Sequence, residues 1–176
     1  DLHKNGMVPP GASSLYFRDE DLRRSCRMLS PPFGNISGSR GTAPIAASWT
    51  MLMSLGLEGF KAVASHSMRL QDQLRKALVK IPGLKILPES KINLTVAYSE
   101  EYDLRPVVKA MEETDWGIVT NDSPPPVAIC ICCMPQNDGQ VDAFVEFLDE
   151  AIKKHAVPIG TLPADYQYKM YGLDLD

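Results

Sequence analysis

Apolar residues recur at helical spacing through the middle of the chain, and this pattern predicts its longest elements. Ile45, Trp49 and Leu52 share one helical face, and a second apolar stripe runs through residues 60–78. Because Gly56 separates the two stripes, we expect two successive helices. The other predicted elements are a strand at 13–17, a charged helical turn at 19–24, strands at 84–87, 92–98, 116–120 and 127–133, and helices at 104–111 and 141–152.

The order of these elements predicts an α/β domain in residues 58–155. Helix, two strands, helix, two strands and helix follow one another there, which can form a small sheet with helices on one face. Asp138 is the expected N-cap of the last helix. Residues 1–57 are predicted to hold one short strand and one helix around two long loops, so we expect them to be the end of a larger layer. Residues 156–176 show no period and are expected to form a C-terminal extension.

Composition and charge then narrow the class of protein. Of the 176 residues 44% are hydrophobic, and 22 acidic against 18 basic residues give a net charge of −4, which is typical of a soluble globular protein. No basic block could follow a phosphate backbone, so nucleic acid is not an expected partner. No apolar run reaches the about 18 to 20 residues that cross a bilayer, and the N-terminus does not resemble a signal peptide. We therefore expect a cytoplasmic protein with no membrane contact.

The four cysteines predict reduced thiols rather than disulfides or a metal centre. Cys130 and Cys132 would share one face of a strand, and Cys133 would lie on the other. No second ligand cluster with zinc spacing accompanies them, so we interpret them as buried core thiols and expect no metal.

Two segments carry candidate chemistry. His3 and Lys4 precede Gly6, which permits close backbone approach, and a buried lysine amine can condense with a carbonyl compound or with pyridoxal phosphate. On composition alone, an exposed His-Lys pair is more often solvated surface. The second segment, residues 37–42, offers hydroxyls, backbone N–H groups and a guanidinium directly before a helix, which suits an anion. Its alternative interpretation is an ordinary helix entry capped by Ser39 or Thr42.

Together these segments resemble the pyridoxal-phosphate-dependent group II decarboxylases. The archaeal-type tyrosine/aspartate decarboxylases are the most similar branch, with sphingosine-phosphate lyases and glutamate decarboxylases as relatives. The lyases tend to continue the second segment with Arg-Pro-Gly, whereas Arg40 is followed here by Gly41 and Thr42, which favours the decarboxylases. The resemblance is carried by residues 1–4, 9–19, 37–49 and 55–60. A weaker resemblance, which includes residues 116–119 and 133–135, extends to about residue 155.

The resemblance implies an α/β chain of the pyridoxal-phosphate-dependent transferase type, fold type I. Residues 1–57 would be the end of the large cofactor domain, followed by the small C-terminal domain. Pyridoxal 5'-phosphate is the implied cofactor, with Lys4 carrying it as an internal aldimine and His3 beside it near the phosphate. Ser39, with Gly38 and Arg40, matches a loop that reaches the cofactor phosphate of the neighbouring subunit in these dimers.

The resemblance also implies partners. In the family, the residues that bind the pyridine nitrogen, stack on the ring and hold most of the phosphate lie upstream of the lysine. No such residues precede Asp1, and the chain has no initiator methionine, so we expect the C-terminal portion of a longer enzyme that forms a homodimer with a shared active site.

Three functions stay open at this point. The first is decarboxylation of an L-amino acid, with tyrosine and aspartate undecided. The second is carbon–carbon cleavage of a phosphorylated substrate, as in the sphingosine-phosphate lyases. The third is a non-enzymatic association domain in which His3 and Lys4 are a frayed terminus.

Overall fold

The computed structural model describes residues 2–26, 41–88, 91–112, 114, 116, 118–121, 127–163 and 166. The chain forms two compact units, Asp1–Phe60 and Lys61–Asp176.

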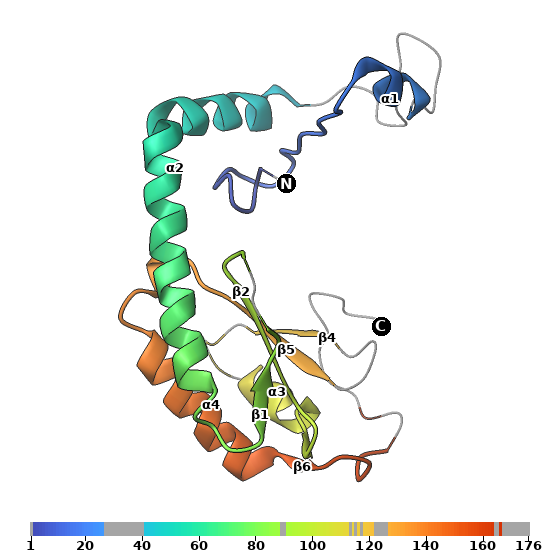
Figure 1. Ribbon diagram of the computed structural model, residues 1–176, viewed down its shortest axis with the longest axis vertical. Coiled ribbons are helices and arrows are strands. Elements are labelled where there is room, and N and C mark those ends of the chain that lie inside the picture. Colours follow the sequence, from blue (N-terminus) through green and yellow to red (C-terminus); the bar gives the residue numbers. More distant parts are fainter. Residues whose placement is uncertain are drawn as a thin grey trace. The chain divides into compact units, whose positions relative to one another are not determined.

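The first unit contains a short helix and the start of a long one (Figure 1). Helix α1 (Glu20–Ser25) begins at the side chain of Asp19, whose carboxylate accepts a hydrogen bond from Leu22 N at 2.8 Å. Helix α2 (Thr42–Leu78) leaves helical geometry at Gly56, where φ is 56° and ψ is −171°. Glycine adopts a positive φ without a Cβ clash, so the predicted break between two helices is confirmed as a kink.

The strand predicted at residues 13–17 does not form, so this prediction was wrong. The segment is irregular, and Leu15 and Tyr16 are 78% and 85% exposed. A strand needs a neighbouring strand to pair its backbone N–H and C=O groups. The described residues of the first unit contain no other strand that could act as this partner.

The second unit is built on a four-stranded antiparallel sheet (Figure 1). Its strands, in spatial order, are β1 (Leu84–Ile86), β2 (Leu94–Ser99), β5 (Ala128–Cys132) and β4 (Val119–Asn121). Val96 of β2 and Val119 of β4 both lie opposite Cys130, one on each side of β5. The four strands predicted in this unit are therefore confirmed, β1 and β5 with shorter bounds and β2 and β4 each ending one residue later than predicted.

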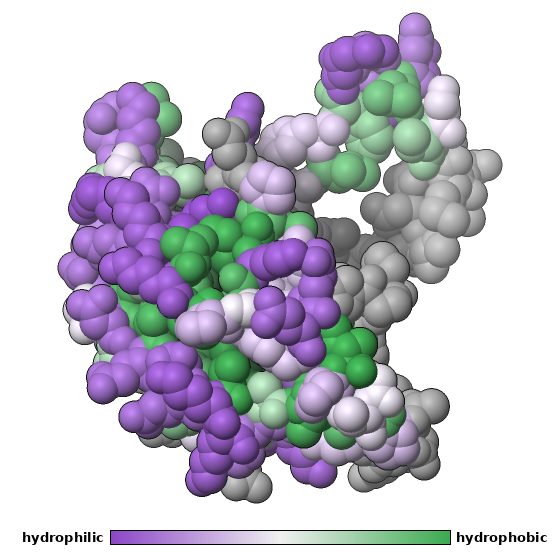
Figure 2. Space-filling model, turned by 60° about the horizontal axis from the view of Figure 1, so that its bottom comes forward, coloured by the Kyte–Doolittle hydropathy of each residue, from purple (hydrophilic) through white to green (hydrophobic). Residues whose placement is uncertain are grey.

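The core lies on one face of this sheet. Ala97 and Ile129 of the sheet are fully buried and share a cluster with Leu74 of α2 and Leu148 of α4 (Val141–His155). Helix α3 (Arg105–Met111) adds further apolar residues to the same cluster. On the opposite face, side chains such as Tyr98 are only half-buried. Helices therefore cover one face, as the element order predicted. Figure 2 shows the mainly hydrophilic surface from another side, with apolar residues between the polar ones.

The predicted cap of α4 was wrong. Its N-cap is Gln140, whose side chain makes no capping bond. A 3-10 turn, η1 (Pro135–Asn137), ends at Asp138, which places this residue too early in the chain to cap α4. Its carboxylate instead lies 3.1 Å from Nε2 of His66 on α2. The side chain predicted as a helix cap therefore forms an ion pair when His66 is protonated.

A second, two-stranded sheet was not predicted. Strand β3 (Tyr102–Asp103) pairs with β6 (Val157–Pro158), which returns the chain after α4 to the start of α3. Further along, the ring of Tyr166 lies 5.4 Å from Nζ of Lys109. Part of the expected C-terminal extension therefore packs on the second unit.

Asp103 joins this small sheet to helix α3. Its side chain is 9% exposed, and its two oxygens accept bonds of 2.7 to 3.1 Å from the backbone N–H and the guanidinium of Arg105. Burial alone would raise the pKa of the Asp103 carboxyl, but the hydrogen bonds from Arg105 outweigh it and hold this pKa below its usual value. The native state therefore favours the charged carboxylate more than the unfolded chain does.

This lowered pKa predicts an acid-dependent loss of stability. The contribution of Asp103 is complete above the unfolded-state pKa of about 3.9 and disappears as the pH falls through the folded-state pKa. We expect Asp103→Asn to lower the free energy of unfolding at pH 7 by about 1–3 kcal/mol, and this difference to shrink as the solution is acidified below about pH 4. Urea unfolding across this pH range measures both effects. Asp72→Asn, at an exposed position on α2, is the control. A deficit that does not change with pH would contradict the assignment.

Candidate functional site

The N-terminal turn presents the two residues with candidate chemistry. Lys4 accepts a hydrogen bond at its carbonyl from Met7 N at 3.0 Å, and Leu2 N donates to Ala12 O at 3.2 Å. Val8 and Ala12 are each only 6% exposed, so they fix the turn to the rest of the first unit. Within this frame His3 is half-buried and Lys4 is exposed.

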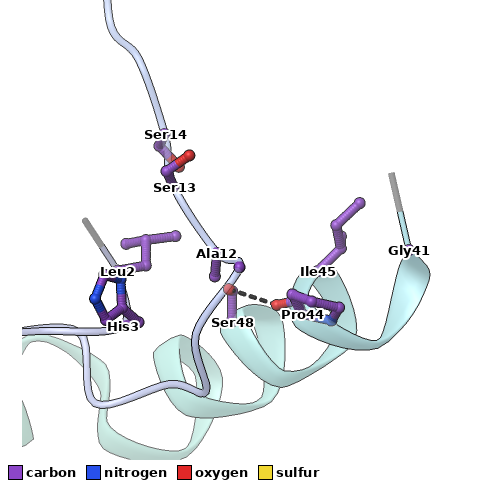
Figure 3. A pocket seen from close by; sticks show the side chains of 10 residues that line it. Leu2, His3, Ala12, Ser13, Ser14, Gly41, Pro44, Ile45 and Ser48 are labelled. Carbon is purple, nitrogen blue, oxygen red and sulfur yellow. Dashed lines mark hydrogen bonds between the residues drawn. The ribbon is translucent and has the colours of Figure 1, made fainter. Parts of the chain in front are cut away.

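A hollow of about 500 Å³ lies between this turn and the start of α2 (Figure 3). Both of its walls belong to the first unit. The loop wall is formed by Leu2, His3 and residues 11–14. The helix wall is formed by Gly41, Pro44, Ile45 and Ser48.

The chemistry of the hollow suits an organic anion. The His3 imidazole and the hydroxyls of Ser13 and Ser14 can donate hydrogen bonds. Ser48 is different, because its hydroxyl donates to Pro44 O at 2.7 Å (Figure 3). Leu2 and Ile45 supply apolar surface beside these donors. A ring that bears an anionic group matches this mixture.

The structure brings only part of the predicted site together. His3 lies in the wall of the hollow, and Lys4 is the next residue in the same turn, although its side chain does not line the wall. Gly38, Ser39 and Arg40 lie outside the described residues, so their proximity to the cofactor stays a prediction. Gly41, which follows them directly, does line the hollow.

Sequence reasoning missed three hydroxyl-bearing residues of the hollow. Ser13 and Ser14 were assigned to a strand, and Ser48 lies inside a helical stripe that was interpreted only for its apolar residues. The pair of adjacent hydroxyls directly after Gly11 and Ala12 was the available signal, because small and polar residues after a glycine often face a ligand rather than a core.

Known proteins with similar sequences point to one enzyme family. L-aspartate decarboxylase from Thermococcus kodakarensis is 32% identical over 125 residues, which are 67% of this chain and 32% of that protein. Sphingosine-1-phosphate lyase from Dictyostelium discoideum is 30% identical over 179 residues, 98% of this chain and 33% of that protein. No protein-family model matches the chain. The chain spans about a third of the length of these relatives.

Solved structures agree with the sequence relatives. A sphingosine-1-phosphate lyase from Burkholderia pseudomallei matches with a TM-score of 0.75 and 28% identity over 88% of this chain and 37% of that one. The chain belongs to the pyridoxal-phosphate-dependent group II decarboxylase family. A glutamate decarboxylase from Lactobacillus brevis shares the fold. It matches with a TM-score of 0.62 and 16% identity over 70% of this chain and 31% of that one.

This membership confirms two predictions made from the sequence. The fold is the α/β fold type I of pyridoxal-phosphate enzymes, and pyridoxal phosphate is the cofactor of the family. The side-chain donors of the hollow could bind the phosphate of this cofactor, its apolar side could bind a ring, and a lysine amine such as that of Lys4 is chemically able to react with an aldehyde. No helix in the described part of this family member is long and apolar enough to cross a membrane.

None of the four cysteines lines this hollow, since three of them belong to the second unit and Cys26 is the C-cap residue of α1. Cys133 is buried as predicted, but Cys132 is exposed and Cys130 is half-buried, because β5 turns only one face toward the core. The description of all three as buried core thiols was therefore wrong. Burial raises the pKa of the Cys130 and Cys132 thiols, and burial together with the neighbouring Cys132 raises that of Cys133 to about 11. Among the described residues no three His, Cys, Asp or Glu side chains form a possible metal site.

These pKa values predict the order of alkylation. The thiolate is the reactive form, and at pH 8 only about one in a thousand Cys133 side chains is ionised. We therefore expect iodoacetamide to modify the exposed Cys26 first and Cys133 last, as measured by peptide mass spectrometry over time. In urea all four rates should converge. Equal rates for Cys26 and Cys133 in the folded protein would show that this burial is wrong.

Proposed function

We propose that this chain carries the lysine-bearing part of the active site of an L-amino-acid decarboxylase. The observation that supports it most directly is the turn that joins Lys4 to His3 at the wall of a hollow suited to a ring with an anionic group. The similarity to L-aspartate decarboxylases supports this reaction, and L-aspartate is therefore the first substrate to test. Tyrosine is the second, because the sequence alone did not separate the two.

Each residue of the site has a proposed role. Lys4 would bind the cofactor covalently through its amine, and it would release the cofactor when the amine of a substrate arrives. His3, half-buried in the wall, would donate a hydrogen bond to the phosphate. Ser39, Gly38 and Arg40 would contact the phosphate bound by a neighbouring subunit. Pyridoxal phosphate supplies an electron sink for the loss of carbon dioxide.

The apolar and polar residues that line the hollow have different proposed roles in binding. Leu2 and Ile45 would offer apolar surface to a bound ring, beside the side chains that could donate hydrogen bonds to an anion. Ser48 keeps its hydroxyl on the helix backbone, so it shapes the wall rather than binding the anion.

Substitution of Lys4 tests this proposal. In the full-length protein Lys4→Ala should lower carbon dioxide release from L-aspartate by about 10³-fold or more, because the covalent attachment of the cofactor is lost. Lys76→Ala, at an exposed position on α2, is the matched control and should retain activity. Retained decarboxylation in Lys4→Ala would refute the assignment.

Carbon–carbon cleavage is the second candidate function. The lyases from Dictyostelium discoideum and Burkholderia pseudomallei support it, since both match most of this chain. The same assays separate the two reactions. A phosphorylated long-chain amino alcohol would yield an aldehyde if the protein is a lyase, and an amino acid would yield carbon dioxide if it is a decarboxylase. The non-enzymatic alternative predicts neither product.

We also propose that the enzyme is a cytoplasmic homodimer with a shared site. Four free cysteines support a reducing compartment. An apolar stripe on the first part of α2, with Trp49 and Met53 about two-thirds exposed, supports an interface.

Oligomerisation of the full-length protein tests the interface. Trp49→Asp should weaken the dimer, because it would bury a charge in an apolar contact. Sedimentation velocity of both proteins measures the change. A parent protein that sediments only as a monomer would contradict the proposal.

A further inference from the structure

Met7 has an unusual backbone conformation in the turn that carries Lys4. Its φ is 55°, and it is the one non-glycine residue with a positive φ in the described part of the chain. A side chain in this region crowds the backbone, so the conformation persists only where surrounding contacts enforce it. Met7 follows Lys4 by three residues, which places the strain inside the candidate site.

Hydrogen bonds at both ends of the turn enforce this conformation. Met7 N donates to Lys4 O at 3.0 Å, and the next residue, Val8, donates from its N to Leu2 O at 3.4 Å. The buried side chain of Val8 cannot turn outward without losing its packing. The reversal of chain direction at Met7 therefore allows both bonds to form at once.

Gly6 adds a second constraint on the same turn. A Cβ atom at this position would overlap the carbonyl oxygen of Leu2 and lie 3.0 Å from Leu2 Cα. These are backbone atoms, so they cannot rotate away as a flexible side chain would. Any side chain at position 6 must push the backbone of residues 2 and 6 apart, and His3 and Lys4 lie between them.

We propose that Gly6 and Met7 are positioning residues that set where Lys4 presents its amine relative to the hollow. Gly6 acts by allowing residues 2 and 6 to approach, and Met7 acts by its left-handed backbone. Neither needs to touch substrate or cofactor. This inference rests on the proposed role of Lys4, and it makes the geometry of the turn, rather than the Met7 side chain, the property that the reaction requires.

The inference is tested in the full-length holoenzyme by substitutions that distinguish the backbone conformation at Met7 from the contacts of its side chain. Met7→Gly keeps the left-handed conformation without a side chain, whereas Met7→Val places a β-branched side chain where it is least tolerated. We expect Met7→Gly to retain kcat and the pH at which the visible absorbance of the lysine-bound cofactor changes. Met7→Val and Gly6→Ala should lower kcat by about 10- to 100-fold and shift this pH, as expected for a misplaced amine.

Gly139→Ala is the matched control for strain alone. Gly139 also has a positive φ, of 74°, but a Cβ there would meet no atom within 4 Å, and it lies in the second unit. This variant should lower the thermal unfolding midpoint without changing kcat or the absorbance profile. It separates a general loss of stability from a displaced Lys4.

The outcomes distinguish this inference from the proposed function. If Met7→Val and Gly6→Ala match the parent in kcat and absorbance while Lys4→Ala is inactive, the positioning role is wrong and the function of Lys4 stands. If Met7→Gly is impaired as severely as Met7→Val, the side chain matters and the inference is also wrong. If Lys4→Ala keeps its activity, the proposed function itself fails. Should Gly6→Ala not fold, the two Met7 variants decide.

Discussion

The close approach of backbone between Leu2 and Gly6 is the constraint on which the candidate site depends. A chain that reverses so tightly needs glycine at the point of contact and a left-handed residue directly after it, and both are present. The reversal places His3 at the wall of the hollow and Lys4 beside it. Without it, the two residues would belong to an ordinary exposed loop.

The second unit provides a different kind of stability. Its antiparallel sheet buries one face under helices, and the ion pair between Asp103 and Arg105 ties the small second sheet to α3. These contacts are apolar packing and well-formed local hydrogen bonds, and they need no ligand to form. The N-terminal turn of the first unit is held by backbone hydrogen bonds of 3.0 to 3.4 Å, and apolar residues such as Trp49 are exposed on this unit. The exposed apolar residues support the proposed subunit interface on the first part of α2.

Much of the second unit could be predicted from the sequence, because periodicity reports burial. The helix through Leu74 and the strand around Ile129 both follow from their apolar spacing. Residues 13–17 show the limit of this argument, since a short segment that ends in three apolar residues becomes a strand only where a partner strand exists. Asp138 shows another, because a side chain that can cap a helix can equally pair with His66 when the turn before the helix is longer than expected. Hydrophobic periodicity does not indicate whether a strand has a partner or whether an aspartate caps a helix.

The candidate site was predicted in a different way. Neither spacing nor composition favoured catalysis at His3 and Lys4, and only the combined motifs of the first 60 residues did so. Motifs find the reactive groups but not the surface around them, which is why the hydroxyls of Ser13 and Ser14 were missed. The left-handed backbone of Met7 also carries no sequence signal, because it arises from contacts that form only when residues 2 and 8 meet.

The central claim is that the amine of Lys4 binds the aldehyde of pyridoxal phosphate. Incubation of the full-length protein with this compound, reduction with borohydride and mass mapping of the peptides tests it most directly. The account predicts a single major adduct, on Lys4. Adducts spread over surface lysines such as Lys76 and Lys91, with none on Lys4, would contradict it.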